Sequence, residues 1–219
     1  DDQINKIITG AGDDIIRGGA EADIIDGGTN TAVGDTADFS DLAYGVIVDL
    51  DTDNTSGNTA VGTAVSNSKT DSLTDIENVT GTVRADDITG DDKNNTIISG
   101  DDNDIIRGLQ GIDYIDGGVG DDDTVDYSKG TQGLIIDLSA TQTFGDDTTY
   151  SVQDDGFGNK EFTANIENVI GTSSVDEIIG NDKDNKLEAG ANADTLYGGA
   201  GNDTLVGGAG ADTFRGGTG

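Results

Sequence analysis

The sequence predicts an all-β protein, a right-handed parallel β-roll in which 18-residue coils stack into a solenoid. Two observations lead to this fold class. Glycine pairs return every nine residues over long stretches, and one aliphatic or aromatic residue follows each turn at a fixed distance. A second, longer period of 90 residues lies above the short one. Self-similarity at fixed periods indicates a repeat architecture.

The nine-residue units fall into three runs, at 1–26, 81–125 and 171–219. Most units have an acid at the sixth position and an apolar residue at the eighth. The eighth positions are Ile7, Ile16, Ile25, Ile88, Ile97, Ile106, Ile115, Thr124, Ile178, Leu187, Leu196, Leu205 and Phe214. The acids at sixth positions are Asp14, Asp23, Asp86, Asp104, Asp113, Asp122, Asp176, Asp194, Asp203 and Asp212.

Each part of a unit has a physical reason. Glycine adopts positive φ at little cost and therefore permits a tight turn. The three residues after the acid suit a short strand with one inward side chain, because side chains alternate across a strand. Turn, strand, turn and strand then make one coil. Units nine residues apart lie on opposite edges of the roll, while units 18 apart stack on the same edge.

The longer repeat is visible in the segments between the runs. IENV at 76–79 returns 90 residues later at 166–169, and VIVDL at 46–50 corresponds to LIIDL at 134–138, 88 residues later. We expect one elongated solenoid, 1–219, with sub-repeats 1–80, 81–170 and 171–219 and variable segments 27–80 and 117–170.

The variable segments permit two arrangements. They could continue the solenoid as degenerate coils, since 54 residues would make three whole coils, or they could form a flanking hairpin or small lid. The sequence also places Ile15, Ile24 and Ile105 at outward positions of the short strands. An exposed apolar stripe is usually covered, so we expect the variable segments to pack over it.

Composition restricts the partners. Acids outnumber bases 44 to 11, which gives a formal charge of −33 and disfavours nucleic acid and anionic lipid as partners. The absence of Cys and His excludes disulfides, thiolate metal sites and the commonest general base. No apolar run approaches the length of a membrane span. Because no signal peptide opens the chain, we expect it to be a segment of a longer protein.

The acidic turns predict a metal. Asp194 is expected to lie over Asp212, and Asp104 over Asp122, and stacked carboxylates repel unless a cation lies between them. Carboxylates with backbone carbonyls form a hard oxygen cage that suits Ca²⁺ and suits Mg²⁺ less well. We expect about 4 to 8 Ca²⁺ ions. The predicted ligands are Gly10, Gly12, Asp14, Gly18, Asp23, Asp86, Asp102, Asp104, Gly108, Asp113, Gly117, Gly118, Gly120, Asp122, Asp176, Gly190, Asp194, Gly198, Gly199, Gly201, Asp203, Gly207, Gly208, Gly210 and Asp212.

Some turns depart from the pattern. Asn5, Asn95 and Asn185 replace the acid at equivalent points of the long repeat. An amide offers an oxygen without a charge, so we expect weaker or empty sites there. The unit that begins at residue 27 has Ala32 at its sixth position and is expected to offer only backbone oxygens.

The units GGAGND at 198–203, GGAGAD at 207–212 and GAGDD at 10–14 resemble the nonapeptides of the repeats-in-toxin family, also called hemolysin-type calcium-binding repeats. The resemblance covers about half of the chain. It implies a calcium-bound parallel β-roll in a protein that a type I secretion system exports, and hence a location outside the cell or on its surface. The family's segments usually lie near the C-terminus of secreted toxins, proteases, lipases, epimerases and adhesins.

We therefore expect a calcium-dependent folding and structural module without catalytic residues of its own. Two alternatives remain. The chain could be an adhesin or polysaccharide-binding module that displays a surface, or the non-catalytic part of a secreted polysaccharide-modifying enzyme. Aromatic residues that could form a sugar platform lie in the variable segments, where we expect them to pack in the core or under a lid: Phe39, Tyr44, Tyr127, Phe144, Phe157 and Phe162.

Overall fold

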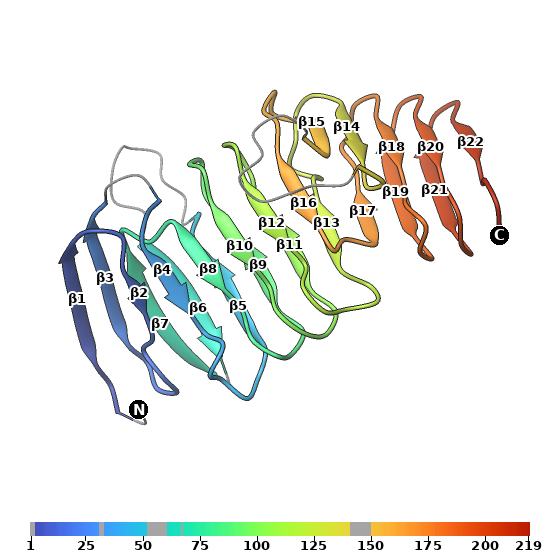
Figure 1. Ribbon diagram of the computed structural model, residues 1–219. Helices are drawn as coiled ribbons and strands as arrows, with labels where there is room; N and C mark the ends of the chain where they lie inside the picture. The colour runs from blue at the N-terminus through green and yellow to red at the C-terminus, as the bar shows by residue number, and fades with distance from the viewer. Residues whose placement is uncertain (1–2, 31–32, 52–60, 67, 141–149) are drawn as a thin grey trace.

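The computed structural model is an elongated stack of short β-strands, with the two ends of the chain at opposite ends of the stack (Figure 1). The structure describes residues 3–30, 33–51, 61–66, 68–140 and 150–219, so the predicted positions Ala32 and Phe144 lie outside it. This described part contains strands and turns but no α-helix. The prediction of an all-β parallel roll is confirmed.

The strands are β1 (Lys6–Ala11), β2 (Ile15–Ile16), β3 (Ile24–Thr29), β4 (Thr36–Asp38), β5 (Val46–Asp49), β6 (Val61–Ser66), β7 (Lys69–Thr74), β8 (Asn78–Thr80), β9 (Asp87–Thr89), β10 (Thr96–Ile98), β11 (Ile105–Arg107), β12 (Tyr114–Asp116), β13 (Thr124–Asp126), β14 (Leu134–Asp137), β15 (Val152–Asp155), β16 (Phe162–Ala164), β17 (Asn168–Ile170), β18 (Glu177–Ile179), β19 (Lys186–Ala191), β20 (Thr195–Tyr197), β21 (Thr204–Ala209) and β22 (Thr213–Arg215).

Two faces form the roll. One is an eleven-stranded sheet of order β1-β3-β7-β6-β5-β9-β11-β13-β17-β19-β21. The other face consists of a six-stranded sheet, β16-β12-β10-β8-β4-β2, and a five-stranded sheet, β15-β14-β18-β20-β22. Within the nonapeptide runs, strands alternate between the faces and pair in parallel with the strand one coil away, as in Thr96↔Tyr114 and Lys186↔Thr204. This register is the predicted 18-residue coil.

The core is a single file of side chains between the faces. Most eighth-position residues are fully buried, namely Ile25, Ile88, Ile97, Ile106, Ile115, Ile178, Leu187 and Leu196. Burying one such side chain stabilises the fold by about 1.5–3 kcal/mol. In the last coils Leu205 is only partly buried and Phe214 is 50% exposed, because no further coil covers them within the chain.

The prediction that Thr124 faces the core is wrong. β13 pairs with β11 as Ile106↔Val125, so Val125 is the buried residue. The turn at 117–123 reads GGVGDDD and is one residue longer than the turn GGAGND at 198–203. The extra residue shifts every later side chain of this unit by one place, because successive strand residues point to opposite faces.

The variable segments contain in-plane hairpins. β5 pairs in parallel with β9, a later strand, and β6 then runs antiparallel to β5 and to β7, which pairs with β3. In the second copy β14 pairs forward with β18, β15 is antiparallel to β14, and β16 pairs back with β12. Each segment thus combines coil strands with a hairpin that extends a sheet of the roll.

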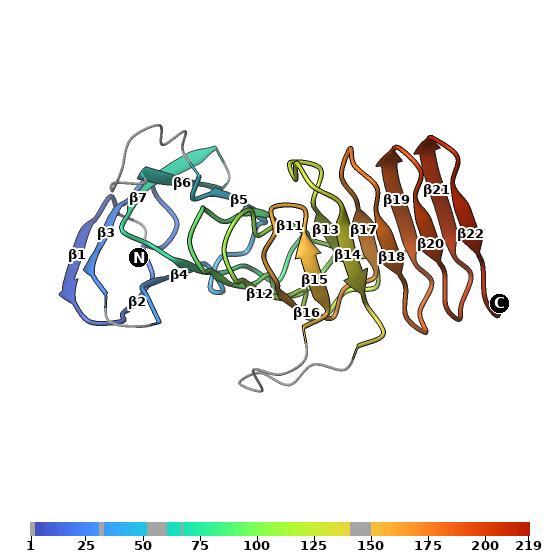
Figure 2. The same ribbon diagram turned by 90° about the horizontal axis from the view of Figure 1, so that it is seen from above.

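The two hairpins lie on opposite faces. β5 and β9 belong to the eleven-stranded sheet, whereas their counterparts β14 and β18, 88 and 90 residues later, belong to the five-stranded sheet. Figure 2 shows β5–β7 on one side of the roll and β14–β16 on the other. Each coil has one strand on each face. Over one long repeat the chain therefore crosses between the faces an odd number of times, and equivalent strands end on opposite faces.

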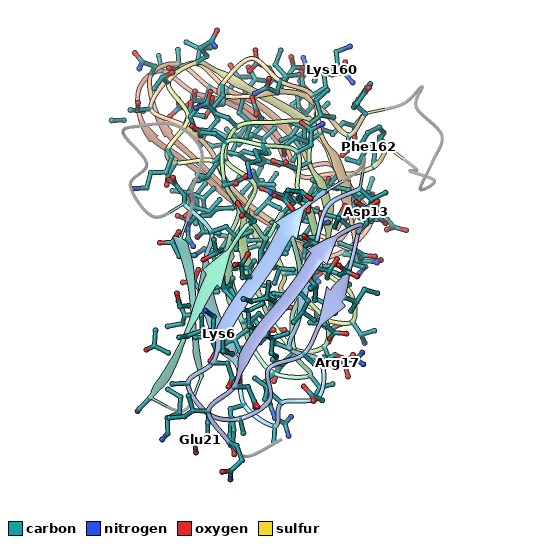
Figure 3. All side chains as sticks on the ribbon, turned by 90° about the vertical axis from the view of Figure 1, so that its left-hand side faces the viewer. Lys6, Asp13, Arg17, Glu21, Lys160 and Phe162 are labelled. Carbon is teal, nitrogen blue, oxygen red and sulfur yellow. The ribbon has the colours of Figure 1, made fainter. Side chains whose placement is uncertain are left out.

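The outward isoleucines are not covered by the variable segments, so that expectation is wrong. Ile15 is 72% exposed, and Ile24 and Ile105 are also exposed. The hairpin strands lie within the sheets, as in the order β3-β7-β6-β5-β9, instead of folding over them. Seen along the roll, charged side chains of the first coil, such as Lys6, Arg17 and Glu21, also point outward (Figure 3).

Adjacent isoleucines of β11 test the single-file core. Ile106→Ala removes a fully buried side chain and should lower the free energy of unfolding by about 2–4 kcal/mol. Ile105→Ala removes an outward side chain, 38% exposed, and should cost less than about 1 kcal/mol. Urea denaturation in calcium measures both values. Equal losses would contradict the described orientation of the strand.

Candidate functional site

A ladder of acidic side chains follows the turns. In each step the Oδ1 atom of a sixth-position aspartate accepts the main-chain N–H of the sixth residue in the preceding coil. The Asp86 N–H donates to Asp104 at 2.7 Å, and the Asp176 N–H donates to Asp194 at 2.9 Å. The Asp194 N–H donates to Asp212 at 3.1 Å, which confirms the predicted stacking of these two residues.

The ladder continues through the variable segments with acids that the sequence analysis missed. Asp35 accepts the Asp14 N–H at 2.7 Å, and Asp71 accepts the Asp23 N–H at 2.8 Å. Asp35 therefore supplies the acid of the turn that was expected to offer only backbone oxygens. Counting in nines could not find these residues, because Asp35 ends a turn longer than a standard unit and Asp71 lies in β7, within the hairpin that interrupts the period.

Two further members are glutamates of the repeated IENV motif. Glu77 accepts the Asp35 N–H through Oε2 at 3.1 Å, and Glu167 accepts the Asp123 N–H in the same way, also at 3.1 Å. Their recurrence 90 residues apart was the signal in the sequence that could have identified them.

The structure places Asp123, and not Asp122, at the ladder position of its turn. The Asp104 N–H donates to Asp123 Oδ1 at 2.9 Å, and Asp123 is fully buried. Asp122 is exposed. The expected stacking of Asp104 over Asp122 is therefore wrong, and Asp104 stacks over Asp123. The cause is the extra residue in the turn at 117–123, which also places Val125 instead of Thr124 in the core.

The second carboxylate oxygen of many ladder residues is buried without a hydrogen-bond donor. Among the described residues seven aspartates have such an Oδ2 atom: Asp23, Asp35, Asp104, Asp113, Asp123, Asp194 and Asp203. An ionised carboxylate oxygen taken from water without a donor or a cation is strongly destabilising. These oxygens therefore require a positive ligand or a proton.

First-position glycines make room for the acids. A Cβ on Gly198 would overlap Oδ2 of Asp203, and a Cβ on Gly108 would overlap Oδ2 of Asp113. The same relation holds for Gly18 with Asp23 and Gly207 with Asp212, and in the longer turn a Cβ on Gly120 would overlap Oδ2 of Asp123 while one on Gly117 would overlap the Asn165 carbonyl oxygen. Only glycine therefore leaves space for the carboxylate within its own turn.

A second group of glycines turns the backbone or lies against the neighbouring coil. Gly208 has φ +86° and its Cα faces the carbonyl oxygen of Gly190, so any side chain would overlap that carbonyl. The other predicted glycines in positive-φ or close-approach positions are Gly10, Gly12, Gly118, Gly120, Gly190, Gly199, Gly201 and Gly210.

Burial changes the acidity of the ladder. Desolvation raises the pKa of Asp104 to about 6 and the pKa values of Asp113 and Asp123 to about 7. Neighbouring carboxylates add to the effect. The Ser99 hydroxyl lowers the pKa of Asp104, although its closest acceptor is the Gly117 carbonyl at 2.9 Å.

Glu161 joins Asp113 in the second variable segment. It is fully buried, and burial together with the charge of Asp113 raises its pKa well above the ordinary value. Tyr127, also buried, donates its hydroxyl to Glu161 Oε2 at 2.7 Å. Glu161 occupies the place that Asp71 has in the first copy, since each directly precedes the first residue that pairs back to the nonapeptide run, Phe162 and Ser72 respectively.

Two predicted ligands have both oxygens occupied by the protein. Asp86 Oδ2 accepts the Thr82 N–H at 2.6 Å, and Oδ1 accepts the Thr82 hydroxyl at 3.0 Å. Asp176 has the same bonds from Thr172, each at 2.7 Å. Threonine therefore closes the turns at 81 and 171 with neutral donors.

The remaining predicted acids lie nearer to solvent. Asp102 is exposed, has φ +76° and accepts the Asn103 N–H at 3.2 Å. Asp14 and Asp212 are partly buried in the outer coils.

The chemistry of the donor set fits Ca²⁺. The open groups are carboxylate oxygens beside glycine-rich backbone, without nitrogen or sulfur ligands. No three acidic side chains of the described residues converge at metal-ligand spacing, so backbone carbonyls would have to complete a coordination shell.

The fold and its open oxygens define a calcium-binding structural module. Comparison with protein families matches the RTX calcium-binding nonapeptide repeat (4 copies) at residues 1–31, 80–115, 98–125, 170–205 and 191–219. These ranges cover more than half of the chain, so the chain belongs to this family. A comparison with curated protein sequences found no match. In the described part of the chain, no helix has the length and hydropathy needed to cross a membrane.

Gly198→Ala tests the space beside a ladder acid. The new methyl group would overlap Asp203 Oδ2, so the calcium concentration at the midpoint of folding should rise about tenfold, equivalent to about 1.4 kcal/mol. Gly216→Ala is the matched control, because a Cβ there meets nothing within 4 Å. Circular dichroism during calcium titration measures both midpoints. An unchanged midpoint for Gly198→Ala would refute the steric argument.

The raised pKa values predict an acid-stabilised, calcium-free chain. In the folded state the pKa values of Asp104, Asp113 and Asp123 are about 6 to 7, above the ordinary value of 3.8. Between these two pH values the folded chain therefore binds more protons than the unfolded chain. Their stabilising contribution is complete below about pH 4 and is lost as the pH rises through about 6 to 7. Without calcium, β-structure measured by circular dichroism should be greater at about pH 5 than at about pH 7.5. The reverse order would contradict the assignment.

Proposed function

We propose that the chain is a calcium-dependent folding and structural module of a secreted bacterial protein. The observation that carries the proposal is the ladder of buried carboxylates with a second oxygen that no protein donor reaches. With a formal charge of −33 and a core one side chain thick, the chain has little else to oppose its self-repulsion.

Calcium would act on the folding equilibrium. An ion held by the open oxygens of Asp104, Asp123, Asp194 or Asp203 neutralises stacked acids in the folded state, and an unfolded chain offers no such site. The free energy of metal binding then becomes free energy of folding. Because seven described aspartates have an open oxygen, the proposal retains about 4 to 8 ions.

The location follows from the same equilibrium. In a cell interior poor in calcium the chain stays unfolded, which suits export through the narrow channel of a type I secretion system. Outside the cell, at millimolar calcium, it folds. The proposal therefore includes secretion or display at the cell surface, and it is supported by the family to which the repeats belong.

We assign no catalysis to this segment and place any reaction in another part of the parent protein. Acids with pKa values near neutrality, such as Asp104, Asp113 and Asp123, already accept main-chain N–H groups of the ladder. Turnover of a uronan or another glycan by this segment alone would contradict this assignment.

A polysaccharide-binding surface is the second candidate, because one groove has suitable chemistry. It has a volume of about 720 Å³ and combines Phe157 with the cations Arg107 and Lys129 and with Asp92. An aromatic ring can cover a sugar face, while charged groups bind hydroxyl or carboxylate substituents. A glycan array with and without calcium tests this function. Binding that disappears in Phe157→Ala would support it.

Calcium titration tests the leading function. Far-ultraviolet circular dichroism should show little strand signal in excess chelator and full signal at millimolar calcium, with magnesium a poor substitute. A full strand signal in chelator would exclude the folding switch.

Two neighbouring aspartates provide a sharper test. Asp123→Asn removes a charge from the buried ladder and should raise the calcium midpoint about tenfold. Asp122→Asn removes the same charge from an exposed side chain and should change the midpoint by less than about twofold. Isothermal titration calorimetry should also count fewer bound ions for Asp123→Asn only. Equal behaviour of the two variants would contradict the ladder assignment.

A further inference from the structure

We propose that the turns at 90–95 and 180–185 are lysine clasps, which close without calcium because Lys93 or Lys183 supplies the positive charge. The inference rests on the proposed function, since it concerns which turns of a calcium-dependent roll need the ion. The two asparagine-containing turns are not among the predicted calcium ligands. In both, the asparagine side chain donates a hydrogen bond to the glutamate carbonyl of the IENV motif.

The amide of Asn95 is satisfied at both ends. Its Nδ2 donates to the Glu77 carbonyl at 2.7 Å and to Asp91 Oδ1 at 3.1 Å, while its Oδ1 accepts the Asp91 N–H at 2.8 Å. The main-chain N–H of Asn95 still donates to Asp113 Oδ1 at 2.8 Å, so the ladder passes through this turn. Asparagine thus leaves no open oxygen for a metal.

The second copy repeats the arrangement. Asn185 Nδ2 donates to the Glu167 carbonyl at 2.8 Å and to Asn181 Oδ1 at 3.0 Å, and its Oδ1 accepts the Asn181 N–H at 2.8 Å. The Asn185 N–H donates to Asp203 Oδ1 at 3.1 Å. Two sequences that differ at several places, GDDKNN and GNDKDN, therefore reach the same bonding pattern.

A lysine completes each clasp. Lys93 Nζ lies 3.1 Å from Glu77 Oε1, and Lys183 Nζ lies 2.5 Å from Glu167 Oε1. The other oxygen of each glutamate accepts a ladder N–H, so the glutamate needs a positive partner as the open aspartates do. The lysine side chain supplies this positive charge, so no bound ion is needed. The neighbouring acids raise the pKa of both lysines.

These pairs differ from ordinary surface ion pairs. The Glu167 side chain is only 1% exposed, and that of Glu77 is 11% exposed. Removing the lysine would leave a buried carboxylate without a counter-charge, which is far more costly than losing an exposed pair.

The IENV motif binds both the asparagine and the lysine of each clasp. Beside the glutamate, Asn78 Oδ1 accepts the Thr96 N–H at 2.8 Å, and Asn168 Oδ1 accepts the Lys186 N–H at 2.8 Å. The motif thus fixes both the turn and the first residue of the strand that follows. The clasps join β8 to β10 and β17 to β19, near the start of the second and third nonapeptide runs. Calcium-dependent coils then have a metal-free coil on which to stack.

Hydrogen exchange of the whole chain in chelator tests the proposal. The amides of Thr96 and Lys186 should exchange about tenfold more slowly than those of Thr195 and Thr213, which follow aspartate turns. In calcium all four should be protected. Lys183→Met should abolish the chelator-resistant protection at Lys186 and preserve it at Thr96, and Lys93→Met should do the reverse.

Lys186→Met is the matched control, because it removes the same charge from an exposed pair with Glu188. It should leave the exchange pattern within about twofold of the parent chain. Asn185→Asp provides a second variant with the lysine intact. It replaces the amide donor by an open oxygen and should make protection at Lys186 depend on calcium.

The outcomes separate the two proposals. If the parent chain in chelator exchanges equally fast at all four amides but gains protection in calcium, the clasp is wrong and the calcium switch remains. If all four are protected in chelator, the calcium switch itself is wrong. Equal effects of Lys183→Met and Lys186→Met would also overturn the clasp.

Discussion

The roll depends on one repeated interaction, a buried carboxylate that binds the backbone of the preceding coil with one oxygen. Asp104, Asp123 and Asp194 show it within the nonapeptide runs and around the inserted hairpins. The interaction joins successive coils at the turns, where the parallel pairing of the strands ends. It also brings acids of successive coils close together in a chain that is already highly negative. What the second oxygen binds therefore decides whether the stack is stable.

Three kinds of turn supply a partner for the second carboxylate oxygen or remove the need for one. Thr82 and Thr172 donate a main-chain N–H to the second oxygen of Asp86 and Asp176, and their hydroxyls donate to the first oxygen. Asn95 and Asn185 replace the charged acceptor by an amide, and a lysine neutralises the adjoining glutamate. The other turns leave the oxygen open, and there a divalent cation fits the chemistry. The threonine and asparagine turns are consecutive units of each long repeat, at 81–95 and 171–185, so a coil that the protein closes itself precedes a group of turns with open oxygens.

The inserted hairpins preserve the ladder instead of interrupting it. Each hairpin adds strands in the plane of a sheet, so parallel coil pairing resumes on either side of it. Asp71 accepts the Asp23 N–H where the chain returns from the first hairpin, and Glu77 and Glu167 accept the N–H groups of Asp35 and Asp123. The insertion therefore changes the outline of the roll without changing the interaction on which its stacking depends.

The sequence by itself determined the short strands, the glycine turns, the inward residues such as Ile97 and Leu196, and the acidic turn positions, because each depends on a pattern inside nine residues. The tertiary structure decided that Asp123 and Val125, not Asp122 and Thr124, occupy the ladder and the core. It also brought Asp35 to the ladder, placed Glu161 beside Asp113, and put the two hairpins on opposite faces. These features depend on turn length and on pairing between strands up to about 50 residues apart, and a local period does not encode them.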